Sequence, residues 1–176
     1  MGIAGSPAAD HLRTIVGHHV WATLRLLDHC QTLPPAQLEL TAPGTYGAIL
    51  QTLSHLVSAD GRYLHRMLTG QPRPRGPAPA SLAAIREEAE RHVDRWREAL
   101  ERLDELDCLL PAEPDEDPPY PEIEHAIGLL IVQAIHHGNE HRAHVCTVLG
   151  ASGLESPELS GWEYVRQQVL AGEAPA

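Results

Sequence analysis

The chain has 176 residues, a length that suits one domain with its own core, so we expect a single domain over residues 1–176. The formal net charge is −11 and all 13 basic residues are arginine, which disfavours DNA or RNA binding because such sites need a positive surface. Polar residues interrupt every apolar run before it could cross a membrane, and the first residues lack the pattern of a secretory signal. Cys30, Cys108 and Cys146 are odd in number and widely spaced, which is typical of reduced thiols. We therefore expect a cytoplasmic protein.

Three loops rich in proline or glycine divide the chain, at residues 33–44, 70–81 and 110–122. Proline ends helices and restricts the residue before it, so these loops mark boundaries. The segments between them have helical periodicity, and none has the alternation of a strand. We predict four long helices and a shorter fifth, at residues 8–32, 46–69, 81–107, 122–149 and about 157–171.

The first predicted helix has an apolar face that includes Val16 and Leu27. Trp21 lies on the opposite side of this helix, where a large aromatic side chain indicates a contact. We expect Trp21 to contact the C-terminal segment around Trp162 and Tyr164, or a second subunit. The sequence thus leaves a homodimer open.

The second predicted helix carries His55 at its centre, beside the small residues Thr52 and Ala59 and off the main apolar stripe. Small neighbours suit the wall of a cleft, but they suit an exposed face equally well. Asp60 lies on the apolar stripe itself, where an unpaired carboxylate would be costly. We expect Asp60 to be paired with an arginine or a backbone donor and to have a structural role.

The third predicted helix has the clearest pattern, with an apolar stripe from Ile85 to Leu103 that includes Trp96. Ser81 is placed to cap its N-terminus. Four helices of similar length, joined by loops of about a dozen residues, favour an all-α four-helix bundle with a short C-terminal helix. The loop lengths leave the order of the helices open.

The fourth predicted helix contains four histidines between residues 136 and 144. His137 and His141 are four residues apart, so they share one face of the helix, and this face also carries its apolar residues. An inward pair of neutral imidazoles at this spacing can chelate Zn(II), Ni(II) or a similar ion. Two core histidines that are satisfied by hydrogen bonds explain the spacing equally well. His136 is rotated toward solvent, and His144 lies at the edge of the apolar stripe.

Two known metal motifs can be compared with these patterns. A zincin helix needs glutamate directly after its first histidine, and here Gly138 follows His137. A hemerythrin-like di-iron site fits better, through His137-x-x-x-His141 and His55-x-x-x-x-Asp60, but the two elements stand in the reverse order. A further His-x-x-x-Glu element is also missing.

Three segments together carry a resemblance to a known family. They are WATLRLLDHCQTLPPAQL at residues 21–38, TYGAILQTLSHLVSADGRYLHRMLTG at residues 45–70 and QAIHHGNEHRAH at residues 133–144. In this order they resemble the DinB-like superfamily of small metal-binding four-helix bundles, which includes thiol-dependent S-transferases. The resemblance therefore implies a DinB-like bundle.

The resemblance also implies three metal ligands, His55, His137 and His141. The family usually has glutamine where this chain has His144, so the role of His144 at the site stays open. Three imidazoles leave a fourth position free on the ion, as catalytic metal sites do.

Four other residues are placed near the predicted centre. Gln133 and Glu140 can each orient an imidazole, although both also fit a solvated helix surface. Arg142 can bind an acidic group of a substrate or lie on the surface. Cys146 is turned away from the histidine pair, which indicates packing rather than nucleophilic chemistry, and the acidic loop 111–121 is placed to rim the cleft.

The resemblance implies one divalent transition metal, with zinc or nickel favoured and iron or manganese left open. A low-molecular-weight thiol bound there as thiolate would attack an electrophile, as in a metal-dependent S-transferase or a related hydrolase. The alternative is a noncatalytic metal-binding or stress-associated bundle. Both hypotheses predict a bound ion, and they differ in turnover.

Overall fold

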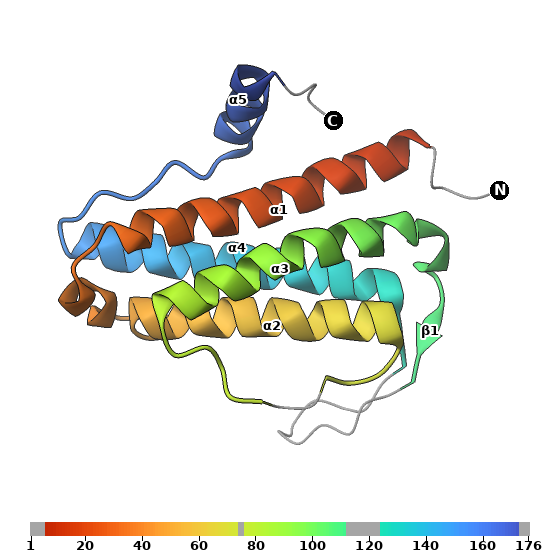
Figure 1. Cartoon of the computed structure of the whole chain (residues 1–176), viewed down its shortest axis with the longest axis horizontal. Coiled ribbons are helices and arrows are strands. Elements are labelled where there is room, and N and C mark those ends of the chain that lie inside the picture. Colours follow the sequence, from red (N-terminus) through yellow and green to blue (C-terminus); the bar gives the residue numbers. More distant parts are fainter. Residues whose placement is uncertain (1–5, 74–75, 112–123, 173–176) are drawn as a thin grey trace.

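The computed structural model describes residues 6–73, 76–111 and 124–172. The elements are α1 (Pro7–Gln31), the 3-10 helix η1 (Pro35–Glu39), α2 (Ile49–Thr69), α3 (Leu82–Glu101), the 3-10 helix η2 (Leu103–Glu105), β1 (Leu109–Leu110), β2 (His125–Ala126), α4 (Ile127–Ala151) and α5 (Gly161–Ala171). Four long helices lie along a common direction and α5 lies outside them (Figure 1). The prediction of an all-α four-helix bundle with a short C-terminal helix is confirmed.

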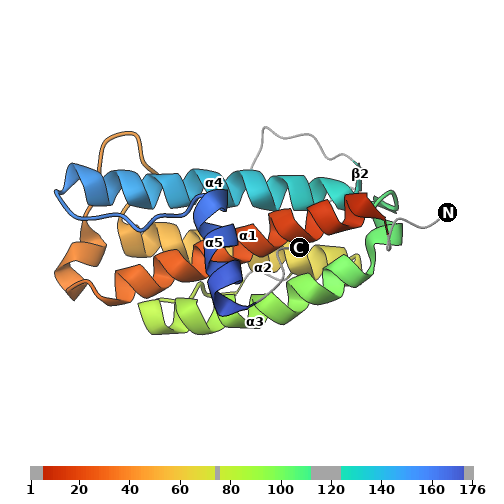
Figure 2. The ribbon, with the colours of Figure 1, turned by 90° about the horizontal axis from the view of Figure 1, so that it is seen from above.

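The order of the helices, which the loop lengths left open, is settled by their contacts. Helix α2 packs against both α3 and α4, and α1 packs against the same two helices from the other side. Helices α1 and α4 run in one direction, and α2 and α3 run in the opposite one (Figures 1 and 2). The connection from α2 to α3 therefore returns along the bundle, which explains why residues 70–81 form a long loop.

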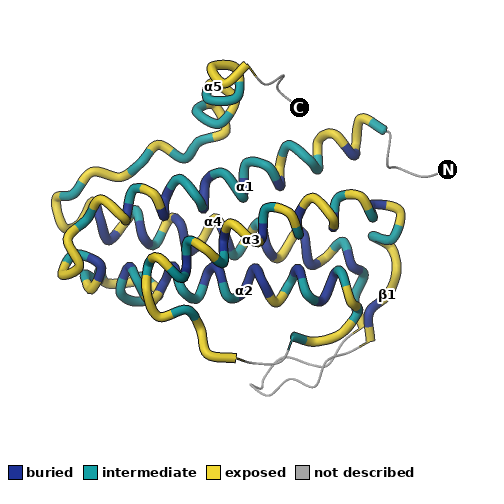
Figure 3. Tube along the Cα trace, viewed as in Figure 1, coloured by how far each residue is buried: buried dark blue, intermediate teal, exposed yellow. Residues whose placement is uncertain are grey.

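Buried residues recur along each of the four long helices (Figure 3), and the buried apolar side chains form two clusters. The first consists of Leu26, Leu27, Cys30, Leu38, Ile49, Leu53, Val57, Ile85, Ala89, Val145, Val148 and Leu149. The second consists of Val16, Leu64, Met67, Trp96, Ala99, Leu110, Ile127, Leu130, Ile131 and Ala134. Most of the buried polar residues lie between the clusters along their helices, as Asp60 does between Val57 and Leu64, whereas Thr52 and Arg66 each lie within one cluster. We call His19, Asp60, His92, Trp96 and Arg142 the central polar network.

Several predicted helix ends differ from the observed ones: α2 begins at Ile49 rather than at residue 46, α5 begins at Gly161 rather than at about 157, and the largest differences are in the third and fourth helices. The third helix was predicted to reach residue 107, but α3 ends at Glu101 and a 3-10 turn follows. The fourth was predicted to begin at residue 122, but α4 begins at Ile127, directly after strand β2 pairs with β1. A two-residue strand is too short to show alternation in a sequence. The predicted rim formed by loop 111–121 falls almost wholly outside the described residues.

Helix α5 rests on α1 through aromatic contacts. The ring centroids of Trp21 and Tyr164 are 5.5 Å apart, and those of His18 and Tyr164 are 5.8 Å apart. The predicted contact between Trp21 and the C-terminal segment is confirmed for Tyr164. Trp162 is 88% exposed and takes no part in it. In the described part of the chain, no helix is both long and apolar enough to span a membrane.

Helices α1 and α4 approach closely at Gly138. A Cβ atom at this position would lie 2.4 Å from Cε1 of His19 and 2.9 Å from Nη1 of Arg142. We expect Gly138→Ala to destabilise the protein by about 1–3 kcal/mol, although alanine favours helices, because the added methyl group overpacks the central polar network. Gly150→Ala, on the same helix with no atom within 4 Å of the added Cβ, is the matched control. Urea unfolding checks both variants, and equal stabilities would contradict the steric argument.

Candidate metal centre

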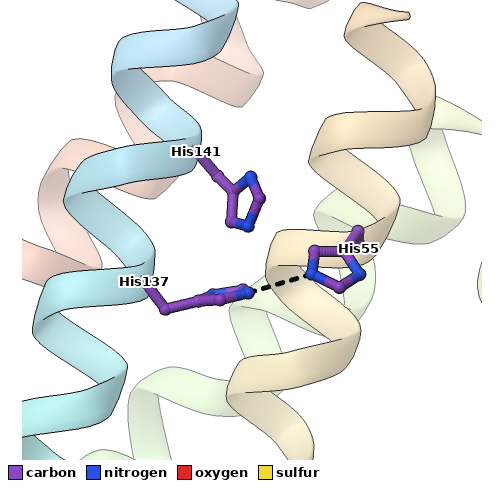
Figure 4. Close-up of side chains that lie close together, drawn as sticks. All are labelled: His55, His137 and His141. Carbon is purple, nitrogen blue, oxygen red and sulfur yellow. Dashed lines mark hydrogen bonds between the residues drawn. The ribbon is translucent and has the colours of Figure 1, made fainter. Parts of the chain in front are cut away.

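Three histidines from two helices converge at the interface of α2 and α4 (Figure 4). His55 lies in the middle of α2, and His137 and His141 lie one turn apart on α4. One ring nitrogen from each histidine lies within 4.8 Å of the others, and Nε2 of His137 is 3.0 Å from Nε2 of His55. The structure therefore brings together the three residues that the sequence and the family resemblance singled out.

The arrangement follows from helix geometry and from the packing of α2 on α4. The spacing of four residues places the rings of His137 and His141 on one face, with centroids 4.2 Å apart. Packing of α2 against this face brings the ring of His55 to 4.9 Å from that of His137 and 4.8 Å from that of His141. The triangle of imidazoles thus comes from a local spacing and one tertiary contact.

The three imidazoles are held in their neutral forms. Burial, together with the charges of His141 and His55, lowers the pKa of His137 to about 3. Burial and the charge of His55 lower the pKa of His141 to about 4, and burial with the charge of Arg62 lowers the pKa of His55. Neutral imidazole is the form that binds metal.

The donor set fits one divalent transition ion. One ring nitrogen of His141 lies within 4.8 Å of nitrogens of both His55 and His137. Nε2 of His55 and Nε2 of His137 face each other between α2 and α4. Among the described residues, each of these two nitrogens has only the other as a hydrogen-bond partner. A cation between the rings would use nitrogen lone pairs that the protein leaves available, and three imidazoles match a catalytic zinc-type site.

A tyrosine that sequence reasoning missed orients one of these imidazoles. The hydroxyl of Tyr46 lies 3.0 Å from Nδ1 of His55, and the two rings stack with centroids 4.3 Å apart. The Tyr46 ring also meets His141 edge-on, at 4.9 Å. Such a partner fixes the orientation of a ligating imidazole, so Nε2 of His55 is the atom turned toward the centre. Tyr46 stood at the start of the predicted helix 46–69, but α2 begins at Ile49, so helical periodicity does not place the Tyr46 side chain.

The other predicted neighbours are more distant from the centre. His144 does not belong to the three-histidine cluster, but its ring lies 5.5 Å from that of His141. Gln133 and Glu140 are exposed, which agrees with the alternative prediction that both lie on a solvated helix surface. The amide of Gln133 lies 3.5 Å from the hydroxyl of Tyr63, whose ring meets His137 at 5.9 Å. Gln133 is therefore connected to the centre only through Tyr63.

Asp60 has different partners from those predicted. Its carboxylate accepts a hydrogen bond from Nε1 of Trp96 at 3.0 Å and lies 3.2 Å from Nε2 of His19 and 3.6 Å from Nδ1 of His92. Burial alone would raise the pKa of Asp60, but the charges and hydrogen bonds of His19 and His92 hold it well below its usual range. The prediction of an arginine or backbone partner is wrong, whereas the structural role agrees with the observed contacts. Asp60 does not join His55, so the hemerythrin-like arrangement lacks its carboxylate.

Arg142 is buried in the core, so the prediction of a surface residue is wrong, and a substrate contact stays a prediction. Only 4% of Arg142 is exposed. Its Nη1 donates to the Thr23 hydroxyl at 2.8 Å and lies 3.3 Å from Nδ1 of His19, and its Nη2 donates to Oδ1 of Asn139 at 2.7 Å. Arg142 therefore continues the central polar network from Asp60 through His19.

The cysteines that the structure describes are free thiols. Burial, with a smaller effect of Cys146, raises the pKa of Cys30 to about 12, and burial raises the pKa of Cys146. A raised pKa keeps a thiol protonated and unreactive at neutral pH. Cys146 accordingly remains a packing residue, as predicted.

The lowered histidine pKa values predict a pH dependence for the metal-free protein. In the unfolded chain an imidazole titrates near pH 6.5, whereas His137 and His141 titrate at about 3 and 4 in the fold. The unfolded chain therefore takes up protons first as the pH falls. We expect stability to decrease from about pH 6.5 toward pH 4, by less than about 1.4 kcal/mol per pH unit for each imidazole because solvent screens the site.

Urea unfolding at pH 7 and pH 5 measures this decrease. His137→Gln should make the decrease smaller, and His136→Gln, a change at the neighbouring exposed residue, should not. Equal pH dependence in the wild type and in His137→Gln would contradict the assignment.

No curated protein matches the chain. A sequence model of the DinB family matches residues 9–173, which include the three converging histidines and most of every helix. Because the match covers nearly the whole chain, it confirms the resemblance: the chain belongs to the DinB family.

Proposed function

We propose that the protein binds one divalent transition ion, zinc or nickel in preference to iron or manganese, through His55, His137 and His141. The observation that carries this proposal is the convergence of three neutral imidazoles within 4.8 Å, one of them oriented by Tyr46. Three nitrogen ligands suit these metals and leave one position for a further ligand.

We further propose that the protein is a metal-dependent S-transferase acting on a low-molecular-weight thiol. A divalent ion at this centre would supply the positive charge that keeps a thiol in its thiolate form, the nucleophile, at neutral pH. The protein residues hold the ion, orient His55 and keep the imidazoles neutral. In the transfer, the sulfur forms a bond to an electrophilic carbon, chloride leaves with the bonding electrons, and the thiol proton goes to solvent.

Metal analysis and a thiol screen test the proposal in that order. Protein purified without an affinity tag should contain one transition ion per chain, and two irons per chain would favour a hemerythrin-like protein instead. The metal-loaded protein should then accelerate the reaction of a small thiol with 1-chloro-2,4-dinitrobenzene, followed by the absorbance of the thioether product. A bound ion without acceleration for any thiol or electrophile would favour the noncatalytic, stress-associated bundle.

A further inference from the structure

A cleft of about 600 Å³ lies between α2, α3 and the described residues Arg73 and 76–79 that connect them. Its wall includes Ser58 and Arg62 from α2, Arg73 from the loop, and Glu88 and Arg91 from α3. This volume lies within the range of about 300–1,000 Å³ that is typical of small-molecule sites. The cleft is therefore large enough for part of a substrate.

The cleft and the three-histidine centre share one side of α2. Ser58 and Arg62 follow His55 by three and seven residues, so Arg62 returns to within about 20° of His55 around the helix axis. Helical side chains lean toward the N-terminus, which directs Arg62 back toward His55. The charge of Arg62 also contributes to the lowered pKa values of His55 and His137. The guanidinium group is thus close enough to act on both imidazoles.

The charges in the cleft leave one arginine without a partner. Arg91 pairs with Glu87 at 2.8 Å and also with Glu88, and Arg73 pairs with Glu88 at 3.3 Å. These contacts neutralise both glutamates. Arg62 is exposed and forms no hydrogen bond or ion pair with any residue that the structure describes. Among the described residues of the cleft wall it is therefore an unpaired cation, in a chain whose net charge is −11.

A hydroxyl group in the same wall also lacks a partner. Oγ of Ser58 is buried and makes no hydrogen bond to the described part of the chain. An unpaired buried polar group costs about 1–3 kcal/mol. Ser58 lies between His55 and Arg62 in the sequence of α2.

We propose that the thiol substrate carries a carboxylate, which Arg62 binds in this cleft while the sulfur reaches the three-histidine centre. The inference rests on the proposed function and names its substrate class, an acidic thiol. The Cα atoms of His55 and Arg62 are separated by about 10 Å along the helix axis, and the Arg62 side chain leans toward the N-terminus and hence toward His55. We therefore expect a spacer of several carbon atoms between the sulfur and the carboxylate of the substrate. A guanidinium group suits this role because it binds a carboxylate through two parallel hydrogen bonds.

Two thiols of equal length test the proposal on the full chain loaded with Co(II). The thiols are 6-mercaptohexanoate and 6-mercaptohexanol, and the sulfur-to-cobalt charge-transfer band reports thiolate binding without any need for turnover. We expect the wild type to bind the carboxylate thiol about tenfold more tightly than the alcohol. Arg62→Gln should reduce this preference to about one, with the affinity for the alcohol nearly unchanged. High salt should weaken the preference in the wild type.

Arg166→Gln is the matched control, because it removes one positive charge from α5, where Arg166 pairs with Glu163. This variant should retain the full preference for the carboxylate. A preference that survives in Arg62→Gln, or a wild type that does not distinguish the two thiols, would overturn the role of Arg62 and leave the metal centre standing. Absence of the charge-transfer band with both thiols would instead refute thiolate binding, and the acidic substrate with it.

Discussion

Replacing His55, His137 or His141 with alanine is expected to lower the affinity for Zn(II) by more than about 100-fold in each case. Loss of an outer partner of a ligand already costs 10- to 100-fold, and loss of the ligand itself leaves two imidazoles. The apolar clusters hold the helices together, so helix content should stay close to that of the wild type. Competition with a chromophoric chelator measures the affinity, and circular dichroism measures the helix content.

His136→Ala is the control for this series, because His136 adjoins His137 but is exposed and turned away from the centre. Its affinity should equal that of the wild type. His144→Ala distinguishes two roles for His144, since a large loss would make it a fourth ligand and a small loss would leave it beside the centre. Loss of binding in His136→Ala, with normal binding in His137→Ala, would contradict the three-histidine centre.

Asp60→Asn is expected to destabilise the metal-free protein by about 2–4 kcal/mol. The carboxylate accepts from Trp96, lies within hydrogen-bond distance of His19, and supplies the negative charge nearest to buried Arg142 in their network. Asparagine has the same shape, but it places an NH₂ group against donors and removes the charge. Urea unfolding of the metal-free protein isolates this effect, because a bound ion would add stability by mass action.

Asp94→Asn provides the comparison for this second prediction. Asp94 pairs with Arg97 on the outer side of α3, and 81% of its side chain is exposed. Exposed pairs contribute at most about 1 kcal/mol, so this variant should stay within that limit. If the two variants unfold at the same urea concentration, the central polar network does not stabilise the bundle.

The helical fold could be predicted from the sequence because proline clusters and apolar periodicity are local signals. The inward direction of His137 and His141 followed from their spacing of four residues. His55 required the family resemblance, because the small residues around it fit a cleft wall and an exposed face equally well. The convergence of His55 on His137 depends on the packing of α2 against α4, which no local pattern encodes.

The errors in the sequence predictions share one physical cause. Arg142 was predicted to bind an acidic substrate group or to lie on the surface, but α4 is covered by α1 as well as by α2, and this buries Arg142. The partner of Arg142 on α1, Thr23, is 119 residues away in sequence. Asp60 was singled out from the sequence because a carboxylate is unusual on an apolar stripe, and its position on this stripe is also the reason why it is buried. Its partners Trp96 and His19 come from other helices, so their identity depended on the helix order.

The separation of the ligands along the chain determines when an ion can be bound. His55 and His137 are 82 residues apart, and most of α2, all of α3 and the start of α4 lie between them. Closing a loop of this length is costly before native packing compensates for it, so the unfolded chain offers only local groups of histidines, such as His137 and His141, and not the three-histidine centre. An ion bound at this centre would therefore not nucleate folding, as it does in zinc fingers whose ligands lie close in sequence. It would enter a bundle that has already assembled, and the polypeptide would have to fold on its own before it could be metallated.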